Sequence, residues 1–380
     1  MESELNWILL GLPIAFGLGW LASRLDLRQW RMENRQNPRA YFRGLNFLLN
    51  EQQDQAIDAF IEAVQNDPDT SELHFALGNL FRRRGEYERA VRVHEHLLAR
   101  GDISLADRQR AQHALALDYL KAGLIDRAED ALLKLEGTPF EQEARLARLA
   151  NYERSRDWSQ AAQIARQLDQ AGQGSFATRL AHYLCEQASA QPEQALALLE
   201  QARETAPHAA RPRLELARLQ LQAGQALSAC AILEDALEAA PSALPLLAAP
   251  LAEAAMAADR VPVVLPRLQA LYRQSPGIDL LQAIVTLHQA SASGAASARD
   301  WYIQHLEQEP SLVAASRWIA GERLEHEQFH PLVQRALDHA VGPLLRYRCA
   351  ACGFEAKQHF WQCPGCQTWD SYPARRVEEL

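Results

Sequence analysis

The chain has 380 residues, a net charge of −9 and 48% hydrophobic residues. The negative balance argues against broad nucleic-acid binding by the whole chain, so we expect no nucleic-acid partner. No β-rich run appears before residue 347, and Gly and Pro concentrate at regular intervals, which predicts an all-α fold with a separate C-terminal element.

The N-terminal segment predicts a transmembrane helix. Trp7–Ala22 contains no charged residue, and a tryptophan lies near each end, where interfacial anchors are found. A cleaved signal peptide fits less well, because the leading region carries Glu2 and Glu4 and no Lys or Arg. A buried core helix is the other alternative. We therefore predict that residues 1–36 form a single-pass anchor and a basic juxtamembrane helix.

Arginines follow the apolar run and set its orientation. Asp26 and Glu33 lie among six basic residues: Arg24, Arg28, Arg31, Arg35, Arg39 and Arg43. The positive-inside rule then predicts a periplasmic N-terminus and a cytoplasmic location for everything after the anchor. The spacing also places the arginines on one helical face. They are interpreted either as a topology signal alone or as a contact with anionic headgroups or an acidic partner.

The middle of the chain repeats at about 34 residues, the period of tetratricopeptide hairpins. A small residue marks the second helix of successive units: Ala56, Ala90, Ala128, Ala161, Ala195 and Ala229. The pattern continues through Val264 and Ala298 to Leu332. Two helices cross closely only where neither carries a large side chain, so the pattern predicts a solenoid of about nine hairpins over residues 37–346.

Turn residues keep the same period. Gly85, Gly123 and Gly224 fall between the two helices of a unit, where a left-handed conformation favours glycine. Tyr87 and Trp158 fall at the start of second helices. Prolines close several units: Pro68, Pro207, Pro241, Pro276 and Pro310. A solenoid of this kind offers its concave face to other proteins.

The C-terminal end carries the strongest motif. Cys349-x-x-Cys352 and Cys363-x-x-Cys366 are two hooks whose four thiolates suit one tetrahedral metal ion. Residues 347–380 are therefore predicted to form a rubredoxin-like metal ribbon and its tail. Four sulfur ligands leave no open position, so we expect a structural ion, zinc first and iron as the alternative. Disulfides or a redox dithiol are the other interpretation of the cysteines.

Such a ribbon is too small to fold without its ion. We expect aromatic side chains to cover the metal site as a miniature core: Phe354, Phe360, Trp361, Trp369 and Tyr372. The linker 342–346 is too short for free movement, so we expect the ribbon to pack on the final hairpins and cap them.

One enzyme motif has to be weighed. His326-Glu327-Gln328-Phe329-His330 matches the H-E-x-x-H of zinc metalloproteases, which works only inside one helix. The repeat register places Glu327 in a turn, and Pro331 disfavours helical geometry at His330. We therefore interpret the match as accidental.

The remaining reactive side chains are isolated. His94 and His96 alternate faces on one helix, so they are not expected to bind one ion. Cys185 and Cys230 lie on apolar helix faces, where cysteine is an ordinary buried side chain. We predict that the chain is not an enzyme.

The series of anchor, tetratricopeptide repeats and C-x-x-C-G…C-P-x-C ribbon resembles the lipopolysaccharide assembly protein B family of Gram-negative bacteria. The resemblance covers the whole chain, from Trp7–Ala22 through the repeat pattern to the four cysteines, with Trp361 and Trp369 flanking the second hook. It implies an adaptor in the bacterial inner membrane that regulates lipopolysaccharide synthesis.

The resemblance also implies partners. Members of this family promote degradation of the committed-step deacetylase (LpxC) by the membrane AAA protease FtsH, and a membrane-anchored lipopolysaccharide sensor opposes them. No residue on the concave face matches a known binding motif. A rubredoxin-type electron-transfer protein and an H-E-x-x-H metalloprotease are the alternative hypotheses. The sequence leaves the oligomeric state open, including a homo-oligomer.

Overall fold

The computed structural model describes most of the chain: residue 20 and residues 42–66, 70–290, 294–323 and 326–380. Contacts divide the chain into two compact units, Met1–Ser155 (unit 1) and Arg156–Leu380 (unit 2). The predicted anchor Trp7–Ala22 lies outside the described residues except for Trp20, and so do the arginines from Arg24 to Arg39.

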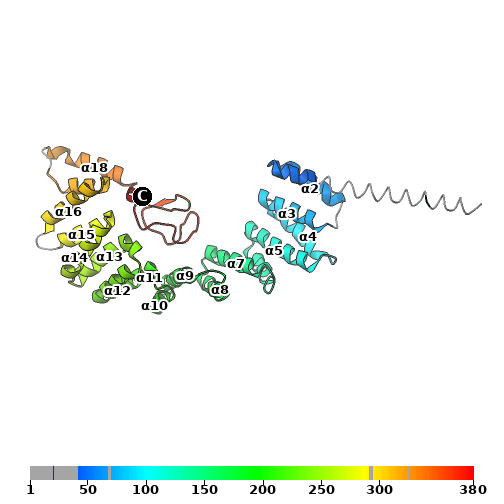
Figure 1. Ribbon diagram of the computed structural model, residues 1–380, viewed down its shortest axis with the longest axis horizontal. Helices are drawn as coiled ribbons and strands as arrows, with labels where there is room; N and C mark the ends of the chain where they lie inside the picture. The colour runs from blue at the N-terminus through cyan, green and yellow to red at the C-terminus, as the bar shows by residue number, and fades with distance from the viewer. Residues whose placement is uncertain (1–19, 21–41, 67–69, 291–293, 324–325) are drawn as a thin grey trace, which may run out of the picture. The chain divides into compact units, whose positions relative to one another are not determined.

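Unit 1 consists of helices that pack on their neighbours in chain order (Figure 1). Residues 42–49 are helical. The helices that follow are α2 Gln53–Asn66, α3 Ser71–Arg84, α4 Tyr87–Ala99, α5 Leu105–Ala122, α6 Ile125–Leu133 and α7 Glu141–Ser155. Local capping explains where such a helix begins and ends. Before α5, Ser104 Oγ accepts a hydrogen bond from Asp107 N at 3.0 Å, and Gly123 ends the helix with a φ of 75°.

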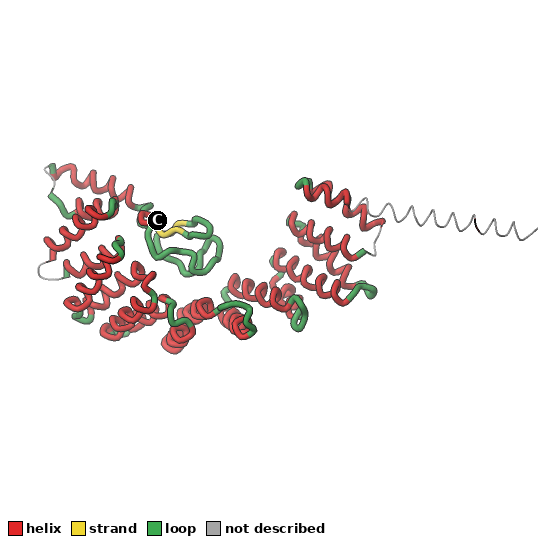
Figure 2. Tube along the Cα trace, viewed as in Figure 1, coloured by secondary structure: helices red, strands yellow, loops and turns green. Residues whose placement is uncertain are grey.

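Unit 2 contains the remaining helices and the C-terminal ribbon, in which short strands lie among loops (Figure 2). Its helices are α8 Trp158–Gln170, α9 Ala177–Ala190, α10 Ala195–Thr205, α11 Ala210–Gln222, α12 Ala226–Ala239, α13 Leu244–Ala257, α14 Val261–Gln274, α15 Ile278–Gln289, α16 Gly294–Gln308, α17 Leu312–Ala320 and α18 His330–Val341. Short 3-10 helices are η1 Pro192–Gln194, η2 Pro241–Ala243, η3 Glu327–Phe329 and η4 Val377–Glu379. Strands β1 Tyr347–Arg348 and β2 Glu355–Ala356 pair antiparallel, with Tyr347 opposite Ala356.

The small residues of the 34-residue pattern lie in the helix interfaces. All but the last of the marked positions are at most 6% exposed: Ala56, Ala90, Ala128, Ala161, Ala195, Ala229, Val264 and Ala298. The prediction is wrong for Leu332, which is 54% exposed on α18. Among the described residues no further α-helix follows α18, so no additional hairpin stacks on it.

The predicted turns are confirmed. Gly85, Gly123 and Gly224 have φ values of 83°, 75° and 73°; the first two directly follow α3 and α5, and Gly224 follows α11 after one residue. Tyr87 and Trp158 are the first residues of α4 and α8. Glycine at these turns avoids the steric cost that a Cβ would add in the left-handed region.

The core of unit 2 is apolar. One buried cluster extends from Ala210 on α11 to Val341 on α18, and a second includes Ala181 on α9 and Leu199 on α10. No single helix within the described residues has both the length and the composition to cross a membrane. One pair, Ala226–Ala239 and Pro241–Ala257, meets both conditions together but bends by 117°. Leu233 and Leu247, on its two halves, are completely buried in that core.

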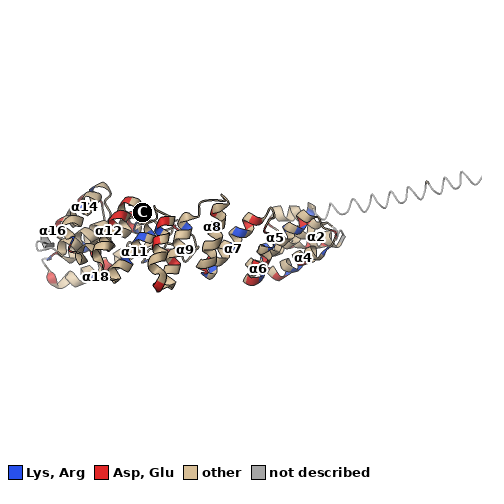
Figure 3. Cartoon of the chain, turned by 90° about the horizontal axis from the view of Figure 1, so that it is seen from below, with Lys and Arg blue, Asp and Glu red and all other residues tan. Residues whose placement is uncertain are grey.

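The boundary between the units falls at Ser155 and Arg156, between α7 and α8. The repeat pattern assigns these two helices to one hairpin, so the compact units do not follow the repeat register. Within each unit, basic and acidic side chains are interspersed along the helices (Figure 3). The predicted domain limits at residues 36 and 346 stay predictions.

Candidate metal centre

Four cysteine side chains converge at the C-terminal end of unit 2. The Sγ atoms of Cys349, Cys352, Cys363 and Cys366 all lie within 4.8 Å of one another. Cys349 and Cys366 are 3.8 Å apart, and Cys352 and Cys363 are 3.7 Å apart. A metal–sulfur bond of about 2.3 Å in a tetrahedron requires sulfur separations of about 3.8 Å. The donor set therefore fits one metal ion, and these separations are far longer than a disulfide bond.

Two similar turns produce this convergence. In the first, Gly353 N donates to Cys349 O at 2.9 Å, and Gly353 has a φ of 77°. In the second, Gln367 N donates to Cys363 O at 2.8 Å, and Gln367 has a φ of 60°. The left-handed residue after each hook reverses the chain, so both sulfurs of a hook point to one side. A glycine fills this position in the first hook and a glutamine in the second.

The four sulfurs differ in their surroundings. Cys349 and Cys363 are each 1% exposed, whereas Cys352 and Cys366 are exposed. Ser371 Oγ lies 3.3 Å from Cys349 Sγ, so a hydroxyl is in place to stabilise a thiolate there. The four thiolates would hold one ion with no position left for water, and such a bound ion would cross-link the two hooks. Zinc and iron both accept this geometry.

The aromatic residues of the ribbon do not all cover the sulfurs, contrary to the prediction. Tyr372 is 4% exposed and packs with Tyr347 and the two buried cysteines, with Phe360 against them. Phe354, however, is 44% exposed. Trp361 packs against the helical core of unit 2. The ribbon thus uses part of its aromatic surface to bind the helices rather than to enclose the metal site.

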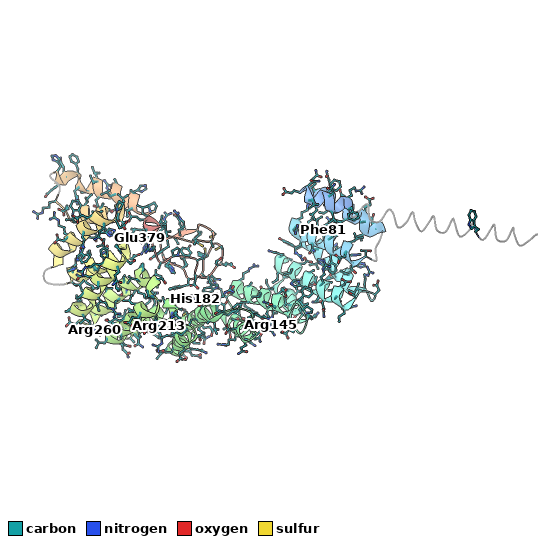
Figure 4. The ribbon with its side chains drawn as sticks, viewed as in Figure 1. Phe81, Arg145, His182, Arg213, Arg260 and Glu379 are labelled. Atoms are coloured by element: carbon teal, nitrogen blue, oxygen red, sulfur yellow. The ribbon has the colours of Figure 1, made fainter. Side chains whose placement is uncertain are left out.

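The ribbon docks on α8 and α9 through Trp369. This side chain is 9% exposed, and its ring stacks on His182 with centroids 4.8 Å apart. Trp158 and Tyr183 meet the same indole edge-on, with centroid distances of 6.0 and 5.8 Å. His182 Nε2 lies 2.9 Å from Asp370 Oδ1 (Figure 4). An aromatic cluster and one polar contact therefore attach the ribbon to these helices.

The predicted position of the ribbon is wrong in part. It does not cap the final hairpin; instead it lies along unit 2 from α8 to α13, where Leu246 packs against its core. A cavity of about 370 Å³ remains between the ribbon and the helices, lined by His182, Arg211 and Trp361 among others. Contacts with the final hairpins come from the C-terminal residues after Tyr372.

Sequence reasoning missed His182 and Asp370, because they lie 188 residues apart in the chain. The available signal was a histidine among apolar residues on a helix, in Ala181-His182-Tyr183-Leu184. His182 is 1% exposed, and buried polar side chains need partners. That signal indicates a partner without identifying it.

The H-E-x-x-H match does not form a metal site. His326 precedes the 3-10 helix η3 with φ −109° and ψ 75°, and α18 begins only at His330. The two histidines therefore do not share a helix. Pro331 lies in the first turn of α18 and tolerates helical geometry at His330, which corrects that part of the prediction. His330 Nε2 instead lies 3.1 Å from Ile319 O.

The other isolated side chains have structural partners. His94 is fully buried, and its Nδ1 lies 2.5 Å from Asp118 Oδ2, whereas His96 stacks on His74. Cys185 and Cys230 are completely buried, and burial raises the pKa of both thiols. Across the described residues, the four ribbon cysteines are the one group of three or more His, Cys, Asp or Glu whose ligand atoms converge.

The helical pairs and the four-sulfur cluster define a tetratricopeptide-repeat protein with a rubredoxin-like metal ribbon. Family models agree: one described as a tetratricopeptide repeat matches residues 187–254, and one described as a rubredoxin metal binding domain matches residues 347–372. Among solved structures, a chain of the Naa15/Naa10 complex bound to HypK-THB aligns with 81% of this chain and 47% of its own. Its TM-score of 0.45 and 15% identity are too low to bear on function.

Two relatives extend along the whole chain. Lipopolysaccharide assembly protein B of Haemophilus influenzae is 30% identical over 390 residues, which cover 97% of each chain. Lipopolysaccharide assembly protein B of Escherichia coli K12 is 28% identical over 393 residues, which cover 99% of this chain and 100% of that protein. This chain belongs to the lipopolysaccharide assembly protein B family, as the sequence motifs predicted.

Proposed function

We propose that this chain is a non-enzymatic adaptor that regulates lipopolysaccharide synthesis. The observation that carries the proposal is its relationship, along nearly its whole length, to proteins named lipopolysaccharide assembly protein B. The architecture supports an adaptor, because stacked helical pairs provide extended surfaces for other proteins.

In the proposed mechanism, Trp7–Ala22 anchors the chain in the bacterial inner membrane, with its N-terminus in the periplasm. The repeats and the ribbon then lie in the cytoplasm. The adaptor binds the deacetylase LpxC and delivers it to the AAA protease FtsH, and a membrane-anchored lipopolysaccharide sensor opposes this delivery. Anchoring supports delivery because it raises the effective concentration of the adaptor near membrane proteins.

The ribbon has a structural part in this mechanism. A bound ion would hold the two hooks together, while Trp369 and Asp370 attach the ribbon to α8 and α9. The ribbon thereby keeps one arrangement relative to the helices of unit 2. A client or protease then meets a single preformed surface, which lowers the entropic cost of binding.

The half-life of LpxC tests the proposal. In cells that lack the native adaptor, the full chain is expected to shorten this half-life several-fold, and FtsH and LpxC are expected to crosslink to it. A chain without residues 1–22 serves as the matched variant and is expected to leave LpxC stable. An LpxC half-life that does not respond to the full chain would contradict the proposed role.

Electron transfer is the second candidate function. It is favoured by one observation: Cys352 and Cys366 are exposed, so a bound iron would lie close to the surface. Purified full chain would then be red and show a reversible reduction potential. A colourless protein with one zinc per chain would exclude electron transfer and leave the adaptor proposal intact.

A further inference from the structure

The C-terminal tail, residues 373–380, is bound along unit 2 beyond the ribbon. It follows Tyr372 and forms the short helix η4. Val377 N donates to Arg346 O at 2.8 Å, and Glu378 N donates to Leu344 O at 3.2 Å. These two bonds hold the tail against the segment between α18 and the ribbon, and they direct two carboxylates toward other helices.

The first carboxylate completes the N-terminus of α17. Glu378 Oε1 accepts from Val313 N at 3.0 Å, and Glu378 Oε2 accepts from Ser311 Oγ at 2.8 Å. Ser311 is also the cap of α17, since its Oγ accepts from Ala314 N at 2.9 Å. A side chain of the tail and a local side chain therefore satisfy free N–H groups of the same helix.

The second carboxylate caps α15, which has no local side-chain cap. Glu379 Oε1 accepts from Ile278 N at 2.8 Å (Figure 4). The preceding residue is Gly277, and a Cβ there would lie 3.1 Å from that same oxygen. The position therefore leaves room for a carboxylate from elsewhere in the chain and supplies an N–H group at a helix terminus that favours negative charge.

Arg376, a basic residue of the tail, fixes the position of the tail on α15. Arg376 makes two hydrogen bonds of 2.9 Å to the carboxylate of Asp279 on α15. Its guanidinium carbon also lies 4.1 Å from the ring centroid of Tyr347, and Nη1 donates to Leu345 O at 2.7 Å. The bound pattern is thus one arginine followed two and three positions later by carboxylates.

The surface that holds the tail is larger than the tail. A cavity of about 200 Å³ lies beside Glu379 and Arg375, lined by leucines that include Leu237, Leu244 and Leu271. The tail leaves this cavity unfilled, and Leu380 ends 60% exposed. Burial raises the pKa of Glu379, so keeping its carboxylate ionised in this position costs free energy. The tail is therefore held by polar contacts rather than by a packed apolar core.

We propose that the tail is an autoinhibitory strap: it occupies, within its own chain, a docking surface on α15 and α17 that takes an acidic segment of another protein. The two carboxylates at the helix N-termini indicate the chemistry that the surface accepts. A partner segment with the same Arg-x-Glu-Glu pattern and one apolar side chain fills the neighbouring cavity and displaces the strap. This inference is independent of the proposed role in lipopolysaccharide assembly, because it concerns contacts within unit 2.

A peptide-binding experiment on the full chain tests the strap. The probe is a fluorescent peptide with the sequence of residues 373–380, followed by anisotropy. The variant Glu378→Ala/Glu379→Ala removes both carboxylate caps, since alanine offers no acceptor, and keeps the docking surface, so it is expected to bind the peptide at least tenfold more tightly than the wild type does. Glu307→Ala/Glu309→Ala is the matched control, because it removes the same charge from two exposed positions of unit 2 and is expected to behave like the wild type.

Hydrogen exchange supplies the second measurement. In Glu378→Ala/Glu379→Ala the amides of Ile278 and Val313 are expected to exchange about fivefold faster, the effect of one lost cap. Asp279→Asn should release the strap as well without altering either glutamate. Unchanged exchange, or a double variant that binds no peptide, overturns the proposal. If the wild type has twice the mass of one chain and Glu378→Ala/Glu379→Ala has the mass of one chain, the tail lies on a second copy, and the proposal is also overturned.

Discussion

The ribbon and the helices of unit 2 are stabilised in different ways. From α11 to α18 the helices share one core that is rich in leucine and alanine side chains, and each helix packs on its neighbours. The ribbon has a small cluster centred on Tyr347, Cys349, Cys363 and Tyr372. Two of these four side chains are predicted metal ligands. The helices therefore stabilise one another, whereas the ribbon depends on its ion and on the surface where it docks.

The contacts between the two regions show how far this difference extends. Trp369 stacks on His182, and Arg376 pairs with Asp279. These are a few specific contacts, in contrast to the stacked apolar surfaces between helices. We infer that the ribbon can lose its structure while the helices keep theirs, and the following predictions test this inference from the largest expected effect to the smallest.

Removal of one metal ligand should give the largest effect. Cys363→Ser is expected to abolish metal binding and unfold the ribbon, since structural zinc sites contribute on the order of 10 kcal/mol. The amides of Cys349 and Gly353 should lose their protection from hydrogen exchange, while the core of α12 and α13 in unit 2 keeps it. Metal analysis and exchange mass spectrometry measure both. Cys230→Ser is the control, a buried cysteine outside the cluster. A variant at Cys363 with one metal ion per chain would contradict the prediction.

The helical region should respond to a change in packing alone. In Gly78→Ala the new Cβ would lie 2.5 Å from the ring of His94, which is fixed by Asp118. We expect unit 1 to lose about 1–3 kcal/mol in the free energy of unfolding, with metal content unchanged. Urea unfolding followed by circular dichroism measures this loss. Gly101→Ala has nothing within 4 Å and is the control. Equal midpoints for the two variants would refute the packing explanation.

The attachment of the ribbon should weaken without loss of its metal. His182→Ala removes the ring that stacks on Trp369 and the contact with Asp370. The free energy that attaches the ribbon to the helices is expected to fall by about 1–2 kcal/mol. The loss stays this small because Asp370 remains hydrated when its partner is removed. The emission of the ribbon tryptophans should shift to longer wavelength. His208→Ala, an exposed residue at the same cavity, should leave the emission unchanged. Metal loss in the His182 variant would show that docking and metal binding are not separable.

The smallest expected effect is a dependence on pH in the helices. Burial lowers the pKa of His305, whose Nδ1 lies 2.6 Å from Tyr272 Oη. The folded state therefore holds His305 neutral, while the unfolded chain protonates it near pH 6.5. Its contribution to stability is present above that pH and is lost as the pH falls further. His305→Gln should reduce the decline in stability between pH 7 and pH 5. If the decline in stability is the same in this variant, other titratable groups cause it.

Several features could be predicted because their signals are local. The 34-residue spacing of small residues located the helix interfaces, and Gly85, Gly123 and Gly224 located turns with positive φ. The two cysteine hooks identified the four sulfurs that converge. Each of these signals consists of residue type and spacing within one or two elements of structure. Short-range backbone geometry connects such patterns directly to conformation.

Other features could not be predicted because they join distant residues. Phe354 and Leu332 were expected to be covered, but they are 44% and 54% exposed. Asp370 was not expected to meet His182, and Glu379 was not expected to cap α15. A single sequence contains the donors and acceptors for these contacts but does not state which pairs meet.

By itself, the sequence determined the helical repeats, the family and the set of four cysteines whose sulfurs converge. Only the tertiary structure decided where the ribbon docks and what the last residues bind. The physical reason is that local propensity and spacing act within one element, whereas docking depends on which surfaces remain uncovered after the helices have stacked. The polar partners of His182 and of the α15 N-terminus follow from that stacking.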